Sequence, residues 1–159
     1  MTSKEFLNEK VKFRGILCTL DESSDKNPNG SRGHRIILPK IVAEKYLHLL
    51  INSPLNCNEG FISHHYNWKN LNIEETIGII TRAIIQDNKL IVYGYIKEDI
   101  VSKMEKLPVN SLGMSYEMKN AGVKDIRKNP WILTKAPFTG AAVLLKSKAA
   151  YQKSSFEIL

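Results

Sequence analysis

Serine and histidine are the residues of this chain whose types and spacing could carry nucleophilic chemistry. An apolar stretch ends on the adjacent histidines His64 and His65, and Ser111 and Ser115 follow in a later strand-like stretch. Serine is a weak nucleophile by itself, so a hydrolase places a base, usually histidine, within hydrogen-bond reach and aims N–H donors at the developing oxyanion. The chain therefore holds the parts of a Ser/His hydrolase. Surface histidines and strand serines without a catalytic role are the alternative.

Strand geometry limits how these residues can combine. Neighbours in a strand point to opposite faces, so only one of His64 and His65 can face a shared site. Ser111, Ser115 and Glu117 have the same parity, and one regular strand would place all three on the same face. Parity therefore predicts one base and does not separate the two serines.

Two other kinds of site can be drawn from the same residues. A transition metal could use the imidazole and thiol groups of His34, Cys57, His64 and His65, but their spacing matches no compact zinc class, and we expect no metal. A set of aromatic and basic residues could instead form a stacking and phosphate-binding surface on a β-platform, although aromatic residues of a hairpin more often pack a core. The residues of this set are Tyr66, Trp68, Lys69, Arg82, Tyr93, Tyr95 and Lys97.

Length and net charge limit the number of domains and the kinds of partner that the chain can have. The chain has 159 residues, 43% of them apolar, which predicts one globular domain over residues 1–159 with a sizeable core. The net charge of +7 is scattered along the sequence. Such a charge would favour an acidic protein substrate or a nucleic acid but identifies neither.

The cysteines and the apolar runs bear on the cellular compartment. Cys18 and Cys57 lack a paired spacing, and the first residues lack the apolar stretch of a secretion signal, so we expect a reducing compartment. No apolar run approaches the roughly 20 residues that a membrane-spanning helix needs. The sequence therefore predicts a soluble protein.

The hydrophobic pattern predicts an α+β fold, with a mainly antiparallel β sheet or small barrel and two or three surrounding helices. Polar residues, glycines and asparagines predict a mobile loop over 21–35, and residues 152–159 are interpreted as a tail or processing segment. Helices are predicted near 39–51 and 98–107. Strands are predicted at 11–20, 77–85, 89–96, 111–118, 131–138 and 140–145.

Several short motifs in a fixed order resemble those of a known family. In chain order they are Asn29-Gly30, Leu38-Pro39, Ser63-His64-His65, the run Ile77 to Thr81 with its hairpin partner Leu90 to Ile96, Leu112 to Glu117, and Phe138 to Leu145 followed by Lys148 to Tyr151. Together they cover roughly residues 11–155 and resemble the phage prohead, or capsid-maturation, serine proteases. That family shares its fold and a Ser-His core with the herpesvirus assemblins.

The resemblance implies roles for individual residues. In the family, a histidine that follows a small residue pair precedes the Ile-Gly strand, and the nucleophilic serine lies about fifty residues further on. His65 as base and Ser115 as nucleophile are 50 positions apart. Ser111 would shorten the gap to 46 and precedes the Leu-Gly-Met-Ser motif, so Ser115 is favoured over Ser111, and His65 over His64.

The third catalytic residue departs from the family's pattern. Relatives orient the base with an acid or a second histidine on a later strand, where this chain has Thr139 between Phe138 and Gly140. Asp125 and Glu117 are the carboxylates that could take this role instead. Either could instead be a solvated charge at a strand edge, which is the interpretation we favour for Glu117, so Asp125 is the preferred third residue.

The resemblance implies a serine endopeptidase that cleaves scaffold and capsid proteins during viral procapsid maturation, through an acyl-enzyme. It implies no cofactor and no metal, with scaffold and major capsid protein as substrates and self-association as a further contact. Neither a membrane nor a nucleic acid is an expected partner. The implied location is the procapsid interior, within the host cytoplasm. The alternative is a non-catalytic scaffold or nucleic-acid-binding domain of the same fold.

Overall fold

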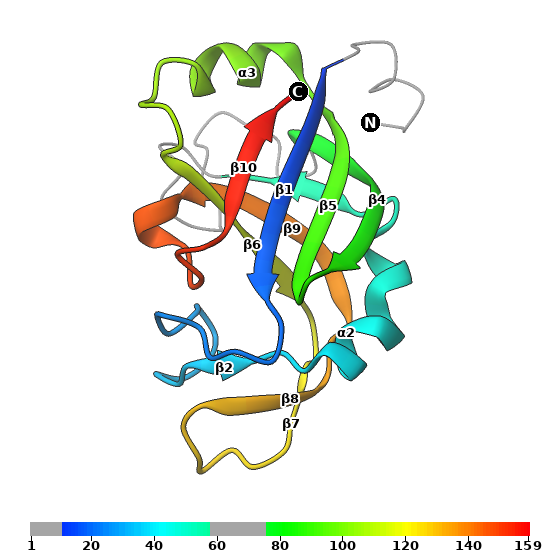
Figure 1. Ribbon diagram of the computed structural model, residues 1–159, viewed down its shortest axis with the longest axis vertical. Coiled ribbons are helices and arrows are strands. Elements are labelled where there is room, and N and C mark those ends of the chain that lie inside the picture. The colour runs from blue at the N-terminus through cyan, green and yellow to red at the C-terminus, as the bar shows by residue number, and fades with distance from the viewer. Residues whose placement is uncertain (1–10, 58–75) are drawn as a thin grey trace.

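A seven-stranded sheet dominates the protein in a computed structural model that describes residues 11–57 and 76–159 (Figure 1). All neighbouring strands of this sheet run antiparallel except β3 and β9, which are parallel. In spatial order its strands are β10 (Ser155–Ile158), β1 (Lys12–Thr19), β5 (Lys89–Ile96), β4 (Gly78–Gln86), β3 (Pro54–Asn56), β9 (Phe138–Leu145) and β6 (Leu112–Met118).

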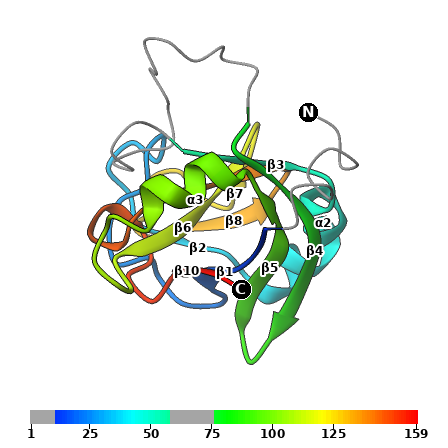
Figure 2. The ribbon, with the colours of Figure 1, turned by 90° about the horizontal axis from the view of Figure 1, so that it is seen from above.

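The seven-stranded sheet curls around one interior, toward which every second residue of β1 points. In β1, Phe13 and Leu17 are fully buried, whereas Lys12 and Arg14 on the opposite face are more exposed. β6 packs against β1 across the interior, where a Cβ at Gly15 would overlap the side chain of Met114. The sheet is therefore nearly closed into a barrel (Figure 2), as the sequence predicts.

The β4–β5 hairpin follows from its two turn residues. Asp87 and Asn88 have φ values of 49° and 61°, the left-handed conformation that a two-residue type I′ turn requires. Asparagine and aspartate tolerate this conformation better than most residues. The predicted hairpin is confirmed, with Gln86 extending β4 to face Lys89.

Two α-helices occur in the described part of the chain, α2 (Lys40–Tyr46) and α3 (Glu98–Met104). The 3-10 helix η1 (Leu47–Leu50) continues α2, so the predicted helix over 39–51 is confirmed. The helix predicted over 98–107 is confirmed but ends at Met104. Among the described residues, no helix has both the length and the apolar character to cross a membrane.

A smaller sheet lies at the end of the barrel opposite α3 (Figure 1). Its strands are β2 (Ile36–Ile37), β8 (Trp131–Lys135) and β7 (Gly122–Val123), with β8 in the middle. β2 and β8 are parallel, and β7 and β8 antiparallel. The strand predicted over 131–138 therefore divides at Ala136 and Pro137, and β9 begins at Phe138.

The predicted tail and the predicted 21–35 loop both contact the rest of the protein. Residues 155–158 of the predicted tail form β10, which pairs with β1 because Phe156 is buried against the core and stacks on Phe13. The 21–35 segment lies against the body of the protein: the backbone N–H groups of Asp25 and Lys26 donate to the Ala150 carbonyl at 2.8 and 3.1 Å. Its mobility stays a prediction.

Candidate active site

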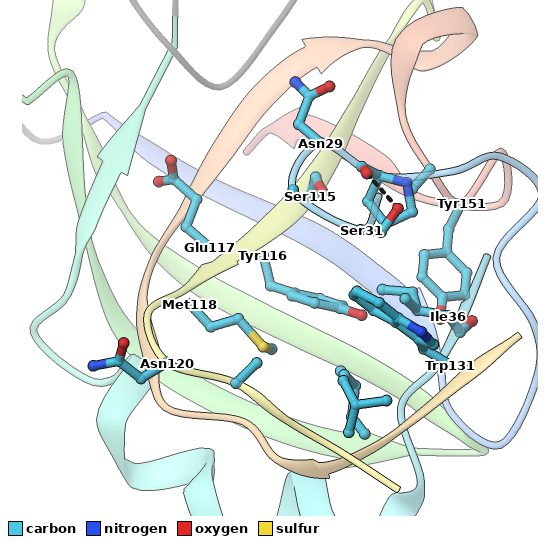
Figure 3. Close-up of a pocket in the computed structure, with 16 residues that line it drawn as sticks. Asn29, Ser31, Ile36, Ser115, Tyr116, Glu117, Met118, Asn120, Trp131 and Tyr151 are labelled. Atoms are coloured by element: carbon cyan, nitrogen blue, oxygen red, sulfur yellow. Dashed lines mark hydrogen bonds between the residues drawn. The ribbon is translucent and has the colours of Figure 1, made fainter. Parts of the chain in front are cut away.

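Ser115 lies in the middle of β6 and is 7% exposed. Its neighbours Met114 and Tyr116 are buried in the hydrophobic core, so the Ser115 side chain points to the opposite face of the strand. Glu117 shares that face and is only half-buried. The Ser115 hydroxyl has no hydrogen-bond partner among the described residues, and Ser115 is one of the residues that line a pocket (Figure 3).

Ser111, the other candidate nucleophile, lies just before β6 and lines a different pocket. Its backbone carbonyl accepts from the Lys146 N–H, and its hydroxyl is buried without a hydrogen-bond partner among the described residues. Four residues of strand separate it from Ser115 by about 13 Å. The two serines thus belong to separate sites, although their parity is the same.

Asn56 connects β3 to the strand that carries Ser115. It pairs with Ala142 of β9, and Ala142 pairs with Ser115, so these three residues form one row across adjacent strands. Two strand spacings place Asn56 and Ser115 about 10 Å apart. The Asn56 side-chain amide donates to Glu117 Oε1 at 2.7 Å, which ties the end of β3 to the same face of β6.

The candidate bases lie outside the described residues. The described part of the chain reaches Cys57, one residue beyond Asn56, and resumes at Thr76. Neither His64 nor His65 is therefore placed, and the choice between them stays a prediction.

The pocket that Ser115 lines has a volume of about 380 Å³, within the range typical of small ligand sites. Its mouth is formed by exposed residues of two loops, among them Asn29, Gly30, Asn120 and Ala121. Its floor is apolar and aromatic, and comes from β2, β6, β8 and the segment before β10. The floor residues are Ile36, Tyr116, Leu133, Ala150 and Tyr151, with Trp131 and Met118 partly buried beside them.

The Tyr116 hydroxyl is an unusual feature of this floor. It is buried and has no partner of hydrogen-bond geometry among the described residues. The nearby Tyr151 hydroxyl donates instead to the carbonyls of Glu22 and Ile36, each at 3.3 Å. Burial raises the pKa of Tyr116 well above its ordinary value, with a smaller contribution from Tyr151, so the phenol is neutral at physiological pH.

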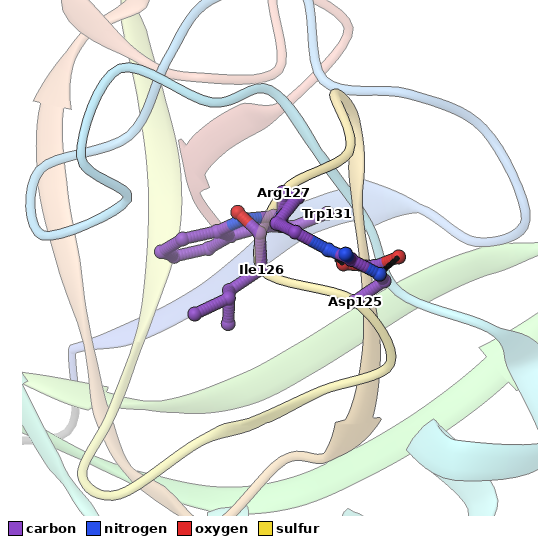
Figure 4. A network of polar contacts seen from close by, with 4 residues as sticks. All are labelled: Asp125, Ile126, Arg127 and Trp131. Atoms are coloured by element: carbon purple, nitrogen blue, oxygen red, sulfur yellow. Dashed lines mark hydrogen bonds and ion pairs between the residues drawn. The ribbon is translucent and has the colours of Figure 1, made fainter.

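The structure separates the carboxylates proposed as a third catalytic residue. Asp125 lies in the β7–β8 turn and pairs with Arg127, whose N–H groups donate at 3.0 and 3.1 Å to one carboxylate oxygen (Figure 4). These bonds lower the pKa of Asp125. Glu117 lines the Ser115 pocket, whereas neither Asp125 nor the exposed Thr139 does.

The candidate metal ligands that the structure describes are engaged in other ways. Burial raises the pKa of the Cys57 thiol to about 12, partly opposed by Lys103, so the thiol stays protonated at neutral pH. His34 Nδ1 lies 2.9 Å from the Ser31 carbonyl oxygen, and its ring stacks on Trp131 at 4.5 Å. No group of three or more candidate ligands gathers within residues 11–57 and 76–159.

Part of the predicted aromatic and basic surface lies on the outer face of the barrel. Arg82 of β4 stacks over the ring of Tyr93, 5.3 Å from its centroid. Arg14 of β1 lies opposite Tyr93 and pairs with Glu157 of β10 at 3.5 Å. The row therefore runs across four strands with the charge of Arg14 balanced by Glu157, while Arg82 lies over a ring. Tyr66, Trp68 and Lys69 fall outside the described residues.

Comparison with known proteins adds no family assignment. No protein-family model matches this chain, and no curated protein matches it.

The pattern reasoning missed the residues that build the pocket floor. The sequence indicates Trp131, Leu133 and Tyr151 only as strand or motif residues, and residues 28–31 only as a loop that carries the Asn29-Gly30 motif. The Asn29-Gly30 turn beside Pro28 was the available signal, because Gly30 adopts a φ of 85° at the pocket mouth. That this loop and β6 line one pocket has no local sequence signature.

Proposed function

We propose that the protein is a serine endopeptidase with Ser115 as nucleophile and His65 as general base. The observation that carries the proposal is the position of Ser115. Ser115 lines a pocket and shares a face and a register row with Asn56, the last residue of β3 before the histidine-bearing stretch. His65 follows Asn56 by nine residues, a length that can span up to about 30 Å, whereas Asn56 and Ser115 are about 10 Å apart.

The proposed reaction is acyl transfer followed by hydrolysis. Ser115 Oγ attacks the scissile carbonyl carbon while His65 takes the hydroxyl proton, and the imidazolium returns that proton to the leaving amine as the C–N bond breaks. Water, deprotonated by His65, then attacks the ester and releases the carboxylate product with Ser115 restored. No metal or organic cofactor enters either step.

Stabilisation of the oxyanion is assigned to the loop at the pocket mouth. The backbone N–H groups of Asn29 and Gly30 make no hydrogen bond with any described residue, and both residues line the pocket with Ser115. Unused N–H donors beside a nucleophile can stabilise a tetrahedral intermediate. Gly30 lacks a side chain that would obstruct the approach.

Glu117 is the better-placed carboxylate for orienting the base. It lies on the same face of β6 as Ser115, two residues away, and Asn56 holds one of its oxygens. Asp125 is instead bound to Arg127 in a turn. We therefore assign the positioning role to Glu117 in preference to Asp125 and Thr139.

The resemblance to prohead proteases supplies the proposed substrates. These are the scaffold and major capsid proteins of an assembling virus, cleaved inside the procapsid in the host cytoplasm, with self-association as a further contact. The excess of 23 Lys and Arg over 16 Asp and Glu is compatible with acidic substrate segments.

The test is incubation of the scaffold and major capsid proteins of the virus proposed to carry this chain with wild-type protein, Ser115→Ala and Ser111→Ala. Cleavage should occur with wild type and with Ser111→Ala, and should fall by at least about 10³-fold in Ser115→Ala. Cleavage by Ser115→Ala at the wild-type rate would contradict the proposal, and loss only in Ser111→Ala would move the nucleophile to the other pocket.

A non-catalytic nucleic-acid-binding domain is the second candidate, favoured by the Arg82–Tyr93 stack on the outer face. The ion pair between Arg14 and Glu157 in the same row weakens this candidate, since the charge of Arg14 is already balanced. Fluorescence anisotropy with labelled single-stranded DNA at several salt concentrations separates the candidates. Binding that falls steeply with salt and is lost in Arg82→Ala would favour this alternative.

A further inference from the structure

We propose that the small sheet carries a docking surface for an acidic, partly apolar peptide segment of another protein. This surface, which we call the basic patch, lies around the turn between β7 and β8 and the end of the loop before β2. Its residues are Arg32, Arg35, Lys124, Arg127 and Lys128. Binding there does not require Ser115 to be a nucleophile, so the basic patch adds a partner beyond the proposed reaction.

The fold gathers most of the net charge of the chain onto the small sheet. Residues 31–37 and 119–135 contain seven Lys and Arg residues and one acidic residue, Asp125, which gives a net charge of +6. The other 135 residues contain 16 basic and 15 acidic residues, and so contribute only +1 of the total of +7. Because Ile36 of β2 pairs with Trp131 of β8, these two distant segments lie together.

The side chains of the basic patch are available to a partner. All five are exposed. Arg127 pairs with Asp125 (Figure 4), and the other four make no ion pair with any described residue. Backbone hydrogen bonds to β8 place Arg35 and Lys124 on its two sides, two strand spacings or about 10 Å apart. Unpaired like charges at this separation repel one another, and an acidic partner relieves the repulsion.

Hydrogen bonds and a ring stack hold the backbone of the basic patch in place. The Arg35 N–H donates to the Asn129 side chain at 3.0 Å, and the Trp131 indole donates to the Ile126 carbonyl at 3.0 Å. The ring of His34 stacks on Trp131, with the centroids 4.5 Å apart. A preformed surface of this kind loses less conformational freedom on binding than a flexible one.

The exposed apolar residues beside the basic patch favour a peptide over a nucleic acid. Ile126 is 62% exposed and Ile132 is 38% exposed. Aliphatic side chains of a peptide can be buried against them, whereas single-stranded nucleic acids use open aromatic rings on which bases stack. His34 and Trp131 stack on each other instead. The matching partner is therefore a segment that combines several Asp or Glu residues with aliphatic residues.

Fluorescence anisotropy of labelled probes measures this binding on the full-length Ser115→Ala protein, which cannot cleave a peptide by the proposed reaction. The main probe is a short peptide that alternates pairs of glutamates with single leucines. The comparison probes are the same peptide with glutamine for every glutamate, the same peptide with serine for every leucine, and a single-stranded DNA of equal charge. The main probe should bind at least about 10-fold more tightly than the glutamine peptide and more tightly than the other two, and its affinity should fall as the salt concentration rises.

A matched pair of double variants locates the binding site. Lys124→Glu with Lys128→Glu reverses two charges of the basic patch and should weaken binding of the main probe by about 10-fold or more. Lys12→Glu with Lys106→Glu makes the same change in net charge at the end of the barrel near α3 (Figure 1), and should weaken binding by less than about 3-fold. All four side chains are exposed, so both variants should keep the wild-type circular dichroism spectrum.

Three results would overturn the proposal. Equal loss of binding in the two double variants would mean that net charge alone determines binding. Equal affinity for the leucine and serine peptides would remove the apolar contact, and tighter binding of the DNA would make the basic patch a nucleic-acid surface.

Failure of the docking surface and failure of the protease give different results. Binding that depends on Lys124 and Lys128, with no cleavage by wild type, would support the docking surface and refute the protease. Cleavage by wild type of the proposed substrates, with no binding of the acidic peptide, would support the protease and refute the docking surface.

Discussion

Replacement of Tyr116 by phenylalanine should stabilise the protein. The hydroxyl of Tyr116 is buried and lacks a hydrogen-bond partner among the described residues, while its ring packs edge-on against Phe138 at 5.7 Å and beside Tyr151. Phenylalanine keeps these ring contacts and removes only the oxygen. The change therefore isolates the energetic consequence of one unsatisfied group.

The expected magnitude follows from the cost of burying an unpaired polar group. A buried donor without a partner costs about 1–3 kcal/mol, so its removal should raise the free energy of unfolding by about 1 kcal/mol, allowing for relaxation around the site. Tyr151→Phe is the matched control, because it deletes a hydroxyl that donates to two carbonyls. That variant should lower the free energy of unfolding by about 1 kcal/mol.

Urea unfolding followed by circular dichroism measures both changes. With a slope of about 2 kcal/mol per molar urea, the midpoint should move up by about 0.5 M in Tyr116→Phe and down by about 0.5 M in Tyr151→Phe. The melting temperature should shift by about 2–4 °C in the same directions. Equal destabilisation by both substitutions would refute the assignment of Tyr116 as unsatisfied.

Three further predictions concern residues away from the pocket floor. Cys18 and Cys57 should not react with a thiol reagent at pH 8 in the native protein and should react in urea, because burial raises the pKa of both thiols; rapid native labelling would contradict this. Asp125→Asn should lower the melting temperature at pH 7 but not at pH 2: the pKa of Asp125 is lowered from 3.8, so the stabilisation is present at neutral pH and lost as pH falls through the folded-state value. The same variant should leave proteolysis unchanged, and loss of proteolysis would return Asp125 to the catalytic set. Gly94→Ala should lower the free energy of unfolding by more than about 2 kcal/mol, because its Cβ would overlap a backbone oxygen of β4; a urea midpoint equal to that of wild type would contradict this close approach.

Local signals in the sequence predicted much of the barrel. Alternating apolar residues gave β1 and β4–β5, and the Asp87-Asn88 pair gave the turn between them. A three-four apolar spacing gave α2, whose first turn is organised by the Pro39 carbonyl accepting from Val42 and Ala43. The conformation of these elements depends on residues that are close together in the sequence. The periodic spacing of apolar residues reveals such local structure.

The remaining elements depend on contacts between distant residues. β3 is short and acquires its position from a parallel pairing with β9, which needs Gly140 because a Cβ there would meet the Pro54 carbonyl at 2.5 Å. β10 exists because Phe156 packs on Phe13, far away in the sequence. The pocket likewise unites the 28–31 loop with β6 and β8.

The candidate site was predictable to the extent that its residues share one strand. Parity places Ser115 and Glu117 on a common face, which the regular register of β6 with β9 between these two residues bears out. Parity could not show that Ser111 lines another pocket, because that depends on where β6 begins and on what packs at each end. The bond between Asn56 and Glu117 joins residues 61 positions apart, beyond any local pattern.

Labelling with a fluorophosphonate reagent, mapped by mass spectrometry, tests the central claim most directly. The reagent forms a stable adduct only with a serine activated by a base. A single adduct should appear on Ser115, persist in Ser111→Ala and disappear in Ser115→Ala and His65→Ala. An unlabelled Ser115 in folded wild-type protein, or labelling that survives the loss of both His64 and His65, would contradict the assignment of Ser115 as a histidine-activated nucleophile.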